Sequence, residues 1–237
     1  EMVWLFDSYT DVGGRDNNED AYCVLTRDDA CLFAVADGLG GCKCGEVASA
    51  LAVQTLKAHF LESPLTLDMG QAFAAVNAAI LAQQTETGIV MKTTLTAVYC
   101  TPEKTVVANV GDSRSYLIRN DRIVFQTVDH SVAQMAVLAG EITADELRQY
   151  PKLNLLTRAL GRETVKADVT ELPADVCDRI LVCSDGFWEY VYENELVQPA
   201  ASPAAWLTAL RTVHAQRIPS RNDNHTAVAA MRRREKE

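Results

Sequence analysis

Aspartates at the ends of strand-like segments constrain this chain more than any other feature. Four short apolar runs stop or start at an acidic residue, in the segments "LFAVADG" (Asp37), "VANVGDSR" (Asp112), "ILVCSDG" (Asp185) and "NDNHTAV" (Asp223). A single Asp after a strand is ordinarily part of a turn. Several carboxylates gathered at neighbouring strand ends would repel one another unless cations compensate them. The repeated pattern therefore predicts a shared cation site.

A fifth acidic feature and the residue types define that site further. The segment "GGRDNNEDAY" places Glu19 and Asp20 directly before another strand-like run. Oxygen ligands without His or Cys favour Mg²⁺ or Mn²⁺ over zinc. A site with two such ions lowers the pKa of a water and delivers hydroxide to phosphorus. Gly38 suits it, because without a Cβ its backbone carbonyl can approach an ion closely.

Two cysteines beside Asp37 suggest a competing thiolate site. Cys42 and Cys44 lie in "GGCKCGE", but a zinc site needs two further ligands, and neither a second close Cys pair nor a His cluster accompanies them. Both thiols are instead expected to begin a helix. A helix N-terminus can lower a thiol pKa, so redox modulation near the site is a hypothesis here.

Length, hydrophobic content, net charge and cysteine content limit which class of protein this can be. With 237 residues, 48% of them hydrophobic, the chain can bury a sizeable core, and one domain over residues 2–231 is expected, followed by a basic tail at 232–237. The net charge of −10 disfavours a nucleic-acid partner. No apolar run is long enough to span a membrane. Cysteines in strand-like segments (Cys23, Cys31, Cys100 and Cys183) are expected to pack as small hydrophobes in a reducing cytoplasm.

Hydrophobic periodicity predicts the order of elements. Strands are expected in "AYCVLTR", "ACLFAVAD", "TTLTAVYC", "TVVANVGD", "SYLIRND", "IVFQTV", "RILVCSD" and "HTAVAAMR". Helices are expected around 45–62, 68–86 and 131–149, and a last one begins with Ser202 as N-cap and Pro203 at its first position. Strands in consecutive groups with helices between them indicate an α+β fold with mostly antiparallel sheets.

The ordered set of motifs resembles a known family. The segments "GGRDNNEDAY", "VADGLGG", "GEVAS", "NVGDSRSYLIR", "LLTRALG", "LVCSDGFWE" and "NDNHTAV" are similar to those of the metal-dependent protein serine/threonine phosphatases of the PPM (PP2C) type, in their short bacterial form. The resemblance runs from about residue 8 to 231. It implies a four-layer αββα sandwich, in which two central antiparallel sheets are flanked by helix pairs.

The resemblance also implies roles for the acidic residues. Asp37 would bridge two Mn²⁺ or Mg²⁺ ions, with Gly38 contributing its carbonyl, and Asp185 and Asp223 would hold the first ion. Glu19 and Asp20 would hold or orient waters on the second ion.

Three further roles follow from the same resemblance. Asp112 would serve a third, weaker ion together with Asp185. Arg15 would bind the phosphate, since its planar fork suits two phosphate oxygens. The segment of about 131–157 would form a mobile flap beside the site.

Some positions depart from the family pattern or have alternative readings. Leu39 stands where eukaryotic members often have a histidine that could act as general acid. His130 and His225 could relay a proton, although capping or turn roles suit them equally. Arg114 and Arg158 are expected to be structural partners of carboxylates.

The leading functional hypothesis is a phosphatase that acts on phosphoserine and phosphothreonine in proteins. It would be a cytoplasmic monomer that opposes a bacterial Ser/Thr kinase, with type VI secretion control as one setting. The alternatives are a phosphoprotein-binding regulator without turnover, and a phosphatase of a partner-switching pathway. Loss of Asp37, Asp185 or Asp223 would have favoured the regulator, and all three are present.

Overall fold

The computed structural model describes residues 3–40 and 44–233. Expectations for Met2, Cys42 and the end of the basic tail lie outside these residues. The strands are β1 (Trp4–Asp11), β2 (Asp20–Arg27), β3 (Ala30–Leu39), β4 (Lys92–Thr93), β5 (Leu95–Cys100), β6 (Lys104–Val110), β7 (Arg114–Arg119), β8 (Arg122–Gln126), β9 (Asp168–Pro173), β10 (Arg179–Cys183) and β11 (His225–Arg232). The helices are α1 (Cys44–Glu62), α2 (Met69–Thr87), α3 (Val132–Leu138), the 3-10 helix η2 (Ala144–Gln149), α4 (Asp185–Trp188), α5 (Glu193–Leu196) and α6 (Pro203–Arg217).

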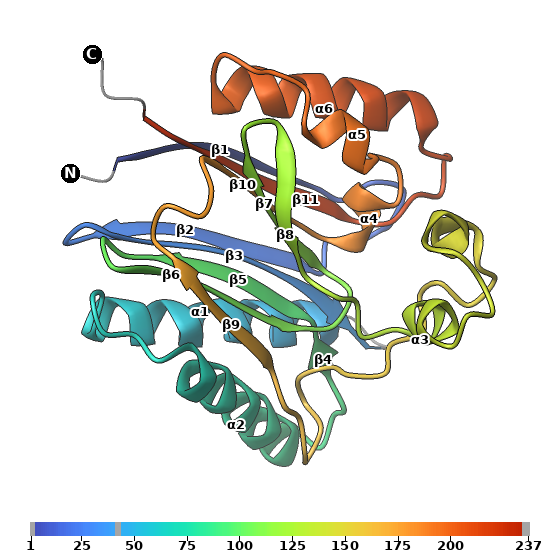
Figure 1. Ribbon diagram of the computed structural model, residues 1–237. Coiled ribbons are helices and arrows are strands. Elements are labelled where there is room, and N and C mark those ends of the chain that lie inside the picture. The colour runs from blue at the N-terminus through green and yellow to red at the C-terminus, as the bar shows by residue number, and fades with distance from the viewer. Residues whose placement is uncertain (1–2, 41–43, 234–237) are drawn as a thin grey trace.

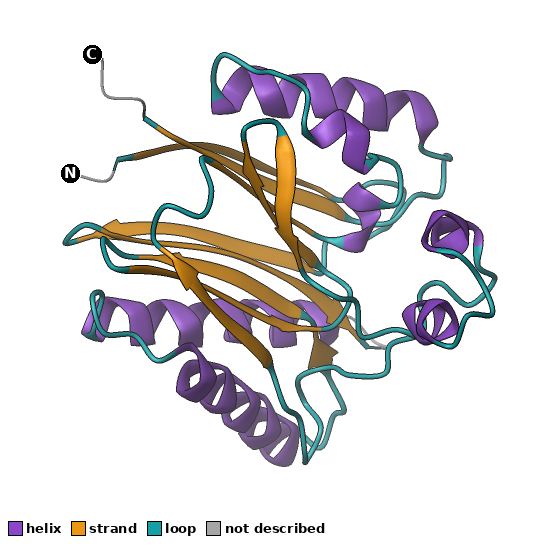
Figure 2. Ribbon diagram, in the orientation of Figure 1, coloured by secondary structure: helices purple, strands orange, loops and turns teal. Residues whose placement is uncertain are grey.

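Two antiparallel sheets form the centre of the molecule (Figure 1). One sheet has the order β1-β11-β10-β7-β8, and the other has the order β2-β3-β5-β6-β9, with β4 paired to β3. Helices α1 and α2 cover the outer face of the second sheet, while α6 lies with the short helices α4 and α5 over the first (Figure 2). The four-layer α+β architecture is therefore confirmed.

The hydrophobic pattern explains why the layers stack in this way. Strand β3 is buried on both faces, because successive side chains point to opposite sides of a strand. Phe33 and Val35 pack between the sheets against residues such as Val98 and Val182. The alternate residues of β3, Leu32 among them, pack under α1 and α2. A third cluster, which contains Phe187, Trp206 and Leu210, joins the first sheet to α6.

Two expected helices match the structure closely because their ends carry local capping signals. Asp68 caps α2 by accepting a hydrogen bond from the Gln71 N–H, at 3.0 Å. Ser202 caps α6 in the same way, by accepting from the Ala205 N–H at 3.1 Å, and Pro203 is its first residue. Each cap satisfies a backbone donor that the first helical turn leaves without an intrahelical partner.

The expectation of one helix over 131–149 was wrong. The segment divides into α3 and η2, because the chain reverses at Gly140, whose φ of +73° favours glycine. Helix η2 then begins with its own capping box between Thr143 and Glu146. Two strands were also missed, β1 and β9. Both are edge strands with exposed positions, so their apolar pattern is weak.

Candidate active site

A pocket of about 510 Å³ lies where the ends of β3, β10 and β11 meet the turn between β6 and β7. Antiparallel pairing explains this meeting, since the C-terminal end of one strand lies beside the N-terminal end of its neighbour. Of the residues predicted for the site, all but Asp20 line this pocket. The lining residues are Arg15, Glu19, Asp37, Gly38, Asp112, Asp185 and Asp223. The structure thus gathers acidic residues that are separated by up to 204 positions in the sequence, from Glu19 to Asp223.

Strand register places Asp20 directly opposite Asp37 across β2 and β3. Oδ2 of Asp20 accepts hydrogen bonds from the Ser184 hydroxyl at 2.8 Å and the Thr226 hydroxyl at 2.7 Å. Ser184 immediately precedes Asp185 at the start of α4. Asp20 therefore connects the second sheet to the two strand ends of the first sheet that carry the other acidic residues.

The pKa values report how closely the carboxyl groups crowd together. Burial, and then the neighbouring Asp185 and Asp20, raise the pKa of Asp37 well above its usual range. Burial raises the pKa of Asp20 to about 7 and that of Asp185 to about 6. Burial, followed by Asp185, raises the pKa of Asp112 as well. Each shift disfavours the charged form in the absence of a compensating cation.

Two carboxylate oxygens in this cluster have no hydrogen-bond partner. They are Oδ1 of Asp20 and Oδ1 of Asp185, and both are buried. Buried acceptors are normally satisfied, so these two oxygens call for a ligand. Within residues 3–40 and 44–233, no three His, Cys, Asp or Glu side chains are arranged closely enough to hold one metal ion among them. The carboxylates instead surround an open pocket, and oxygen donors of this kind suit Mg²⁺ or Mn²⁺.

Gly38 has a packing role that the sequence did not reveal. A Cβ at Gly38 would overlap the backbone carbonyl of Gly45, near the start of α1. A Cβ at Gly45 would in turn overlap Oε2 of Glu19. The two glycines thus let β3, α1 and the Glu19 side chain approach one another beside Asp37.

Arg15 lies at the rim of the pocket, where 59% of its side chain is exposed. Its Nε is 3.4 Å from Oδ1 of Asp223. Asn224 holds the loop that carries Arg15: its Nδ2 donates to the carbonyls of Val12 and Asn17. Its Oδ1 accepts from the Glu19 N–H at 2.9 Å. Sequence reasoning missed this amide, although its place beside Asp223 could have suggested it.

The segment 131–157 forms one wall of the pocket through Asn154 and Leu156. Its two ends are joined, since Ser131 and Leu156 form an antiparallel bridge and the Thr157 N–H donates to the His130 carbonyl. Sequence reasoning placed this segment beside the site but did not single out Asn154. A lone Asn in a loop gave no signal by itself.

Several residues whose roles could not be decided from the sequence have partners outside the pocket. Arg114 forms two hydrogen bonds with the Asp129 carboxylate, at 2.9 and 2.7 Å. Arg158 donates to Oδ1 of Asp168 at 2.8 Å, and His130 pairs with Oδ2 of the same residue at 2.7 Å.

The other histidine considered for proton transfer also lies away from the pocket. His225 shares a hydrogen bond with the Tyr9 hydroxyl at 2.8 Å and packs against the His214 ring. Among the described residues that line the pocket there is no histidine. These placements favour structural roles for both His130 and His225.

The cysteines expected to behave as hydrophobes, Cys23, Cys31, Cys100 and Cys183, are all buried in strands. Cys44 is the first residue of α1, as expected, and it is also buried. Among the described residues no helix is long and apolar enough to cross a membrane.

Comparison with known proteins places this chain and its architecture in one family. A family model described as protein phosphatase 2C matches residues 13–224. The serine/threonine phosphatase stp of Listeria welshimeri is 36% identical over 193 residues, which are 77% of this chain and 77% of that relative. The crystal structure of the Mycobacterium tuberculosis serine/threonine phosphatase PstP/Ppp matches with a TM-score of 0.85 and 31% identity, over 98% of this chain and 99% of that one.

A further solved structure bears on the cations. It is the catalytic domain of the phosphatase PstP in complex with two manganese ions, and it matches with a TM-score of 0.81 and 31% identity over 98% of this chain and 99% of that one. The resemblance drawn from the motifs is confirmed, and with it the prediction of a phosphatase. The chain belongs to the protein phosphatase 2C family.

Proposed function

We propose that this protein hydrolyses phosphoserine and phosphothreonine on other proteins, with Mn²⁺ or Mg²⁺ as cofactor, and that residues 2–231 form its catalytic domain. The observation that carries the proposal is the cluster of acidic side chains around one pocket, in which Oδ1 of Asp20 and of Asp185 lack hydrogen-bond partners. Two cations would satisfy these oxygens and offset the burial and the mutual repulsion that raise the carboxyl pKa values.

The residues that would hold the ions are those that the family resemblance implies. Asp37 would bridge the two ions, Asp185 and Asp223 would bind the first, and Glu19 and Asp20 would hold or orient waters on the second. Such ions, when bound, lower the pKa of a water and so supply the nucleophile that attacks phosphorus. In the family member noted above, the catalytic domain of PstP binds two manganese ions. A third, weaker ion at Asp112 and Asp185 remains part of the proposal.

The protein's own side chains would bind and orient the phosphate group. Arg15, at the pocket rim, has a planar guanidinium whose donors match two phosphate oxygens. Asn154 and Leu156 line the same pocket and would limit access of water to the reacting group. The titratable groups that line the pocket within the described residues are carboxyls and Arg15, so the leaving serine oxygen must take its proton from a carboxyl or from water.

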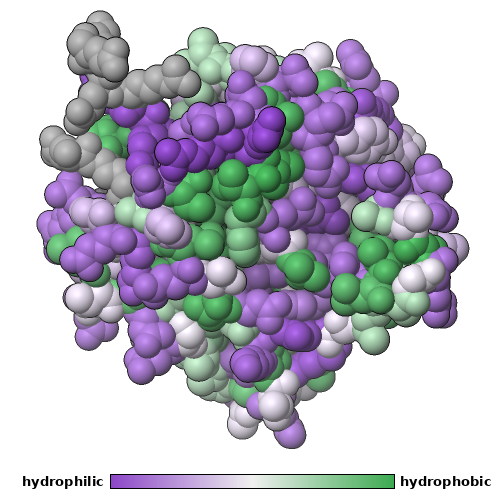
Figure 3. Space-filling model, in the orientation of Figure 1, coloured by the Kyte–Doolittle hydropathy of each residue, from purple (hydrophilic) through white to green (hydrophobic). Residues whose placement is uncertain are grey.

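A protein substrate is supported by the surface next to the pocket. The side chains of Met135, Leu138 and Leu155 are exposed on the segment 131–157. Figure 3 shows apolar side chains gathered at the right of the view, where Figure 1 places α3. Exposed apolar patches of this kind often contact other proteins. The phosphorylated substrate implies an opposing bacterial Ser/Thr kinase, and type VI secretion control is one setting we propose for the pair, with the enzyme acting as a cytoplasmic monomer.

The test is turnover of p-nitrophenyl phosphate and of a phosphothreonine peptide, with Mn²⁺ and with EDTA. We expect activity that requires the cation and that falls at least about a hundredfold in Asp37→Ala and Asp185→Ala. Asp175→Ala is the matched control, since the Asp175 carboxylate is 75% exposed and does not line the pocket. Absence of cation-dependent turnover in the intact protein would refute the enzyme, and equal activity in all variants would refute the site.

A further inference from the structure

Backbone pairing and the contacts of η2 are two of the attachments of the segment 131–157 to the rest of the protein. The first is its base, where residues 130–132 pair with residues 155–157. The second is η2, whose Leu147 is buried in the core cluster that joins the first sheet to α6 and whose Arg148 contacts the chain between the end of α4 and the start of α5. The base holds the two ends of the segment together. Ala133 of α3 and Leu147 of η2 pack in the core cluster that contains Trp188, and Arg148 adds polar contacts to the chain that follows Trp188.

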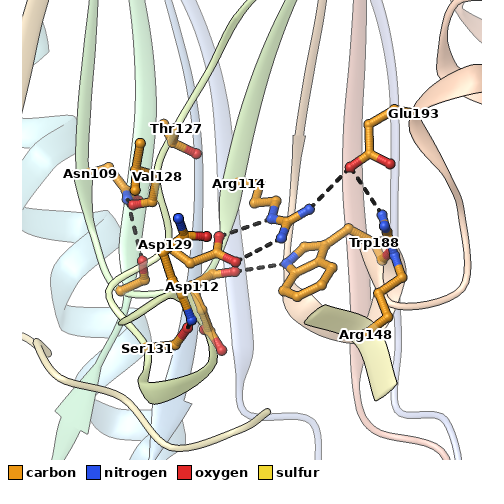
Figure 4. Close-up of polar contacts among 12 residues, drawn as sticks. Asn109, Asp112, Arg114, Thr127, Val128, Asp129, Ser131, Arg148, Trp188 and Glu193 are labelled. Carbon is orange, nitrogen blue, oxygen red and sulfur yellow. Dashed lines mark hydrogen bonds and ion pairs between the residues drawn. The ribbon is translucent and has the colours of Figure 1, made fainter. Parts of the chain in front are cut away.

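Arg148 is the polar part of that second attachment (Figure 4). Its Nε donates to the Trp188 carbonyl at 3.1 Å, and its terminal nitrogen donates to Glu193 at 3.2 Å and to the Val191 carbonyl at 3.4 Å. Its guanidinium lies 4.9 Å from the Tyr192 ring centre and 5.6 Å from the Trp188 ring centre. Only 17% of the Arg148 side chain is exposed. One side chain thus contacts four residues between the end of α4 and the start of α5, namely Trp188, Val191, Tyr192 and Glu193.

The contacts continue from Arg148 to two acidic residues of the pocket. Trp188 is the last residue of α4, which begins at Asp185, and its Nε1 donates to the Asp112 carbonyl at 2.7 Å. A second guanidinium also contacts this tryptophan. The Arg114 guanidinium lies 3.5 Å from the Trp188 ring centre, and it donates a hydrogen bond to Glu193 at 3.4 Å. Trp188 and Glu193 are therefore shared between Arg148 and the segments that carry Asp112 and Asp185.

We propose that Arg148 is a positioning residue: it fixes the pocket wall formed by residues 131–157 relative to the carboxylates of Asp112 and Asp185. The proposal rests on the phosphatase activity for its kinetic consequence, but the attachment itself can be measured in the protein without cation. When Arg148 is removed, η2 keeps its apolar contact through Leu147 and loses its hydrogen bonds and ring contacts. The wall then moves more freely over the pocket.

A simpler role would be that Arg148 only stabilises the loop between α4 and α5. Arg217 provides the matched control, because it binds the same loop from α6. It donates to the Tyr190 carbonyl and to the Glu195 carboxylate, and its guanidinium lies 4.3 Å from the Tyr192 ring centre. If loop stability were the whole effect, Arg148→Ala and Arg217→Ala would behave alike.

The first measurement is amide hydrogen exchange in EDTA on the intact chain. We expect exchange of residues 144–157 to be about tenfold faster in Arg148→Ala than in the unchanged protein, and unchanged in Arg217→Ala. Arg148→Lys keeps the charge and one hydrogen bond but lacks the planar fork, so we expect it to restore part of the protection. Unchanged exchange in Arg148→Ala, or equal acceleration in Arg217→Ala, would overturn the proposal.

The second measurement is kcat and KM for the phosphothreonine peptide at saturating Mn²⁺. In Arg148→Ala we expect kcat/KM to fall about tenfold, with most of the change in kcat, and in Arg217→Ala to change less than twofold. An unchanged kcat/KM in Arg148→Ala overturns the positioning role whatever the exchange result. No turnover in the unchanged protein would count against the proposed function, and the exchange result would then decide the attachment alone.

Discussion

Gly38 shows how one residue can serve both the fold and the site. Its neighbour Asp37 lies close to several acidic residues, and the N-terminal turn of α1 approaches the same stretch of β3. Because a Cβ at Gly38 would meet the Gly45 carbonyl, any larger residue must push β3 and α1 apart. That displacement would act directly on Asp37. Glycine at this position is therefore required by packing, in addition to any role of its carbonyl toward a cation.

Gly38→Ala tests this explanation. We expect it to lower the free energy of unfolding by about 2 kcal/mol, the usual scale of overpacking, and to reduce phosphatase activity. Gly70→Ala is the control, since Gly70 lies in α2, its added Cβ would meet nothing closer than 3.4 Å, and alanine favours helix by about 1 kcal/mol. Urea unfolding measures both. A Gly38→Ala protein as stable as the unchanged chain would contradict the packing argument.

At the scale of elements, a buried ion pair joins β7 to the segment that leads from β8 into α3. Arg114 begins β7 and Asp129 lies two residues before Ser131, the N-cap of α3, and their side chains are 4% and 2% exposed. The pair is bidentate, so it fixes the direction of both segments. This contact explains why the segment 131–157 begins close to the Asp112 turn. It is also the contact that Trp188 covers from the side of α4.

Asp129→Asn should therefore be costly. It keeps the shape of the side chain but leaves the Arg114 charge buried, with Glu193 as its remaining acidic partner at 3.4 Å. We expect a loss of about 3 kcal/mol in the free energy of unfolding, the scale for breaking a buried pair. Asp175→Asn removes an exposed partner of Arg119 and should cost less than about 0.5 kcal/mol. Equal costs in denaturant unfolding would show that burial of the pair is unimportant.

At the scale of the whole molecule, burial of the acidic pocket disfavours the charged forms of its carboxyl groups in the folded protein without cation. Several carboxyls have raised pKa values, so the folded protein without cation binds more protons than the unfolded chain above about pH 4. The net charge of −10 adds a general repulsion of the same sign. We therefore expect stability and cation binding to be coupled through these groups.

The pH dependence of unfolding in EDTA follows with a definite sign. Burial raises the pKa of Asp20 to about 7 and that of Glu189 to about 8, and stability is lost as pH rises through a raised carboxyl pKa. We therefore expect the melting temperature in EDTA to fall from pH 7 to pH 8. His225, whose pKa burial lowers to about 4, acts in the opposite sense but mainly at lower pH.

Addition of Mn²⁺ should reverse this trend. Binding to the folded state raises the melting temperature, and it does so more at pH 8 than at pH 7, because deprotonated carboxylates bind the ion more tightly. Asp185→Asn should lose most of the Mn²⁺ effect at both pH values. A Mn²⁺ shift that is independent of pH, measured by calorimetry, would argue against coupling through these carboxyls.

The sequence by itself determined the features that depend on residues close to one another along the chain. Capping chemistry placed the start of α6 at Pro203 and the start of α2 after Asp68, since a cap and its helix are adjacent in sequence. The alternation and length of apolar runs identified the central strands. The recurrence of aspartate at their ends predicted which carboxylates would meet, although not which atoms would lack partners.

Tertiary structure alone decided the features that depend on contacts between distant segments. The register that sets Asp20 opposite Asp37 arises from the packing of whole strands, and the burial of Leu147 of η2 arises from its packing with residues such as Phe187 and Trp206. The edge strands β1 and β9 are defined by their partners more than by their own residues. Arg148 lies in no motif, whereas Trp188 belongs to the segment "LVCSDGFWE". Their contact arises only because folding brings the 131–157 segment onto the helix that begins at Asp185.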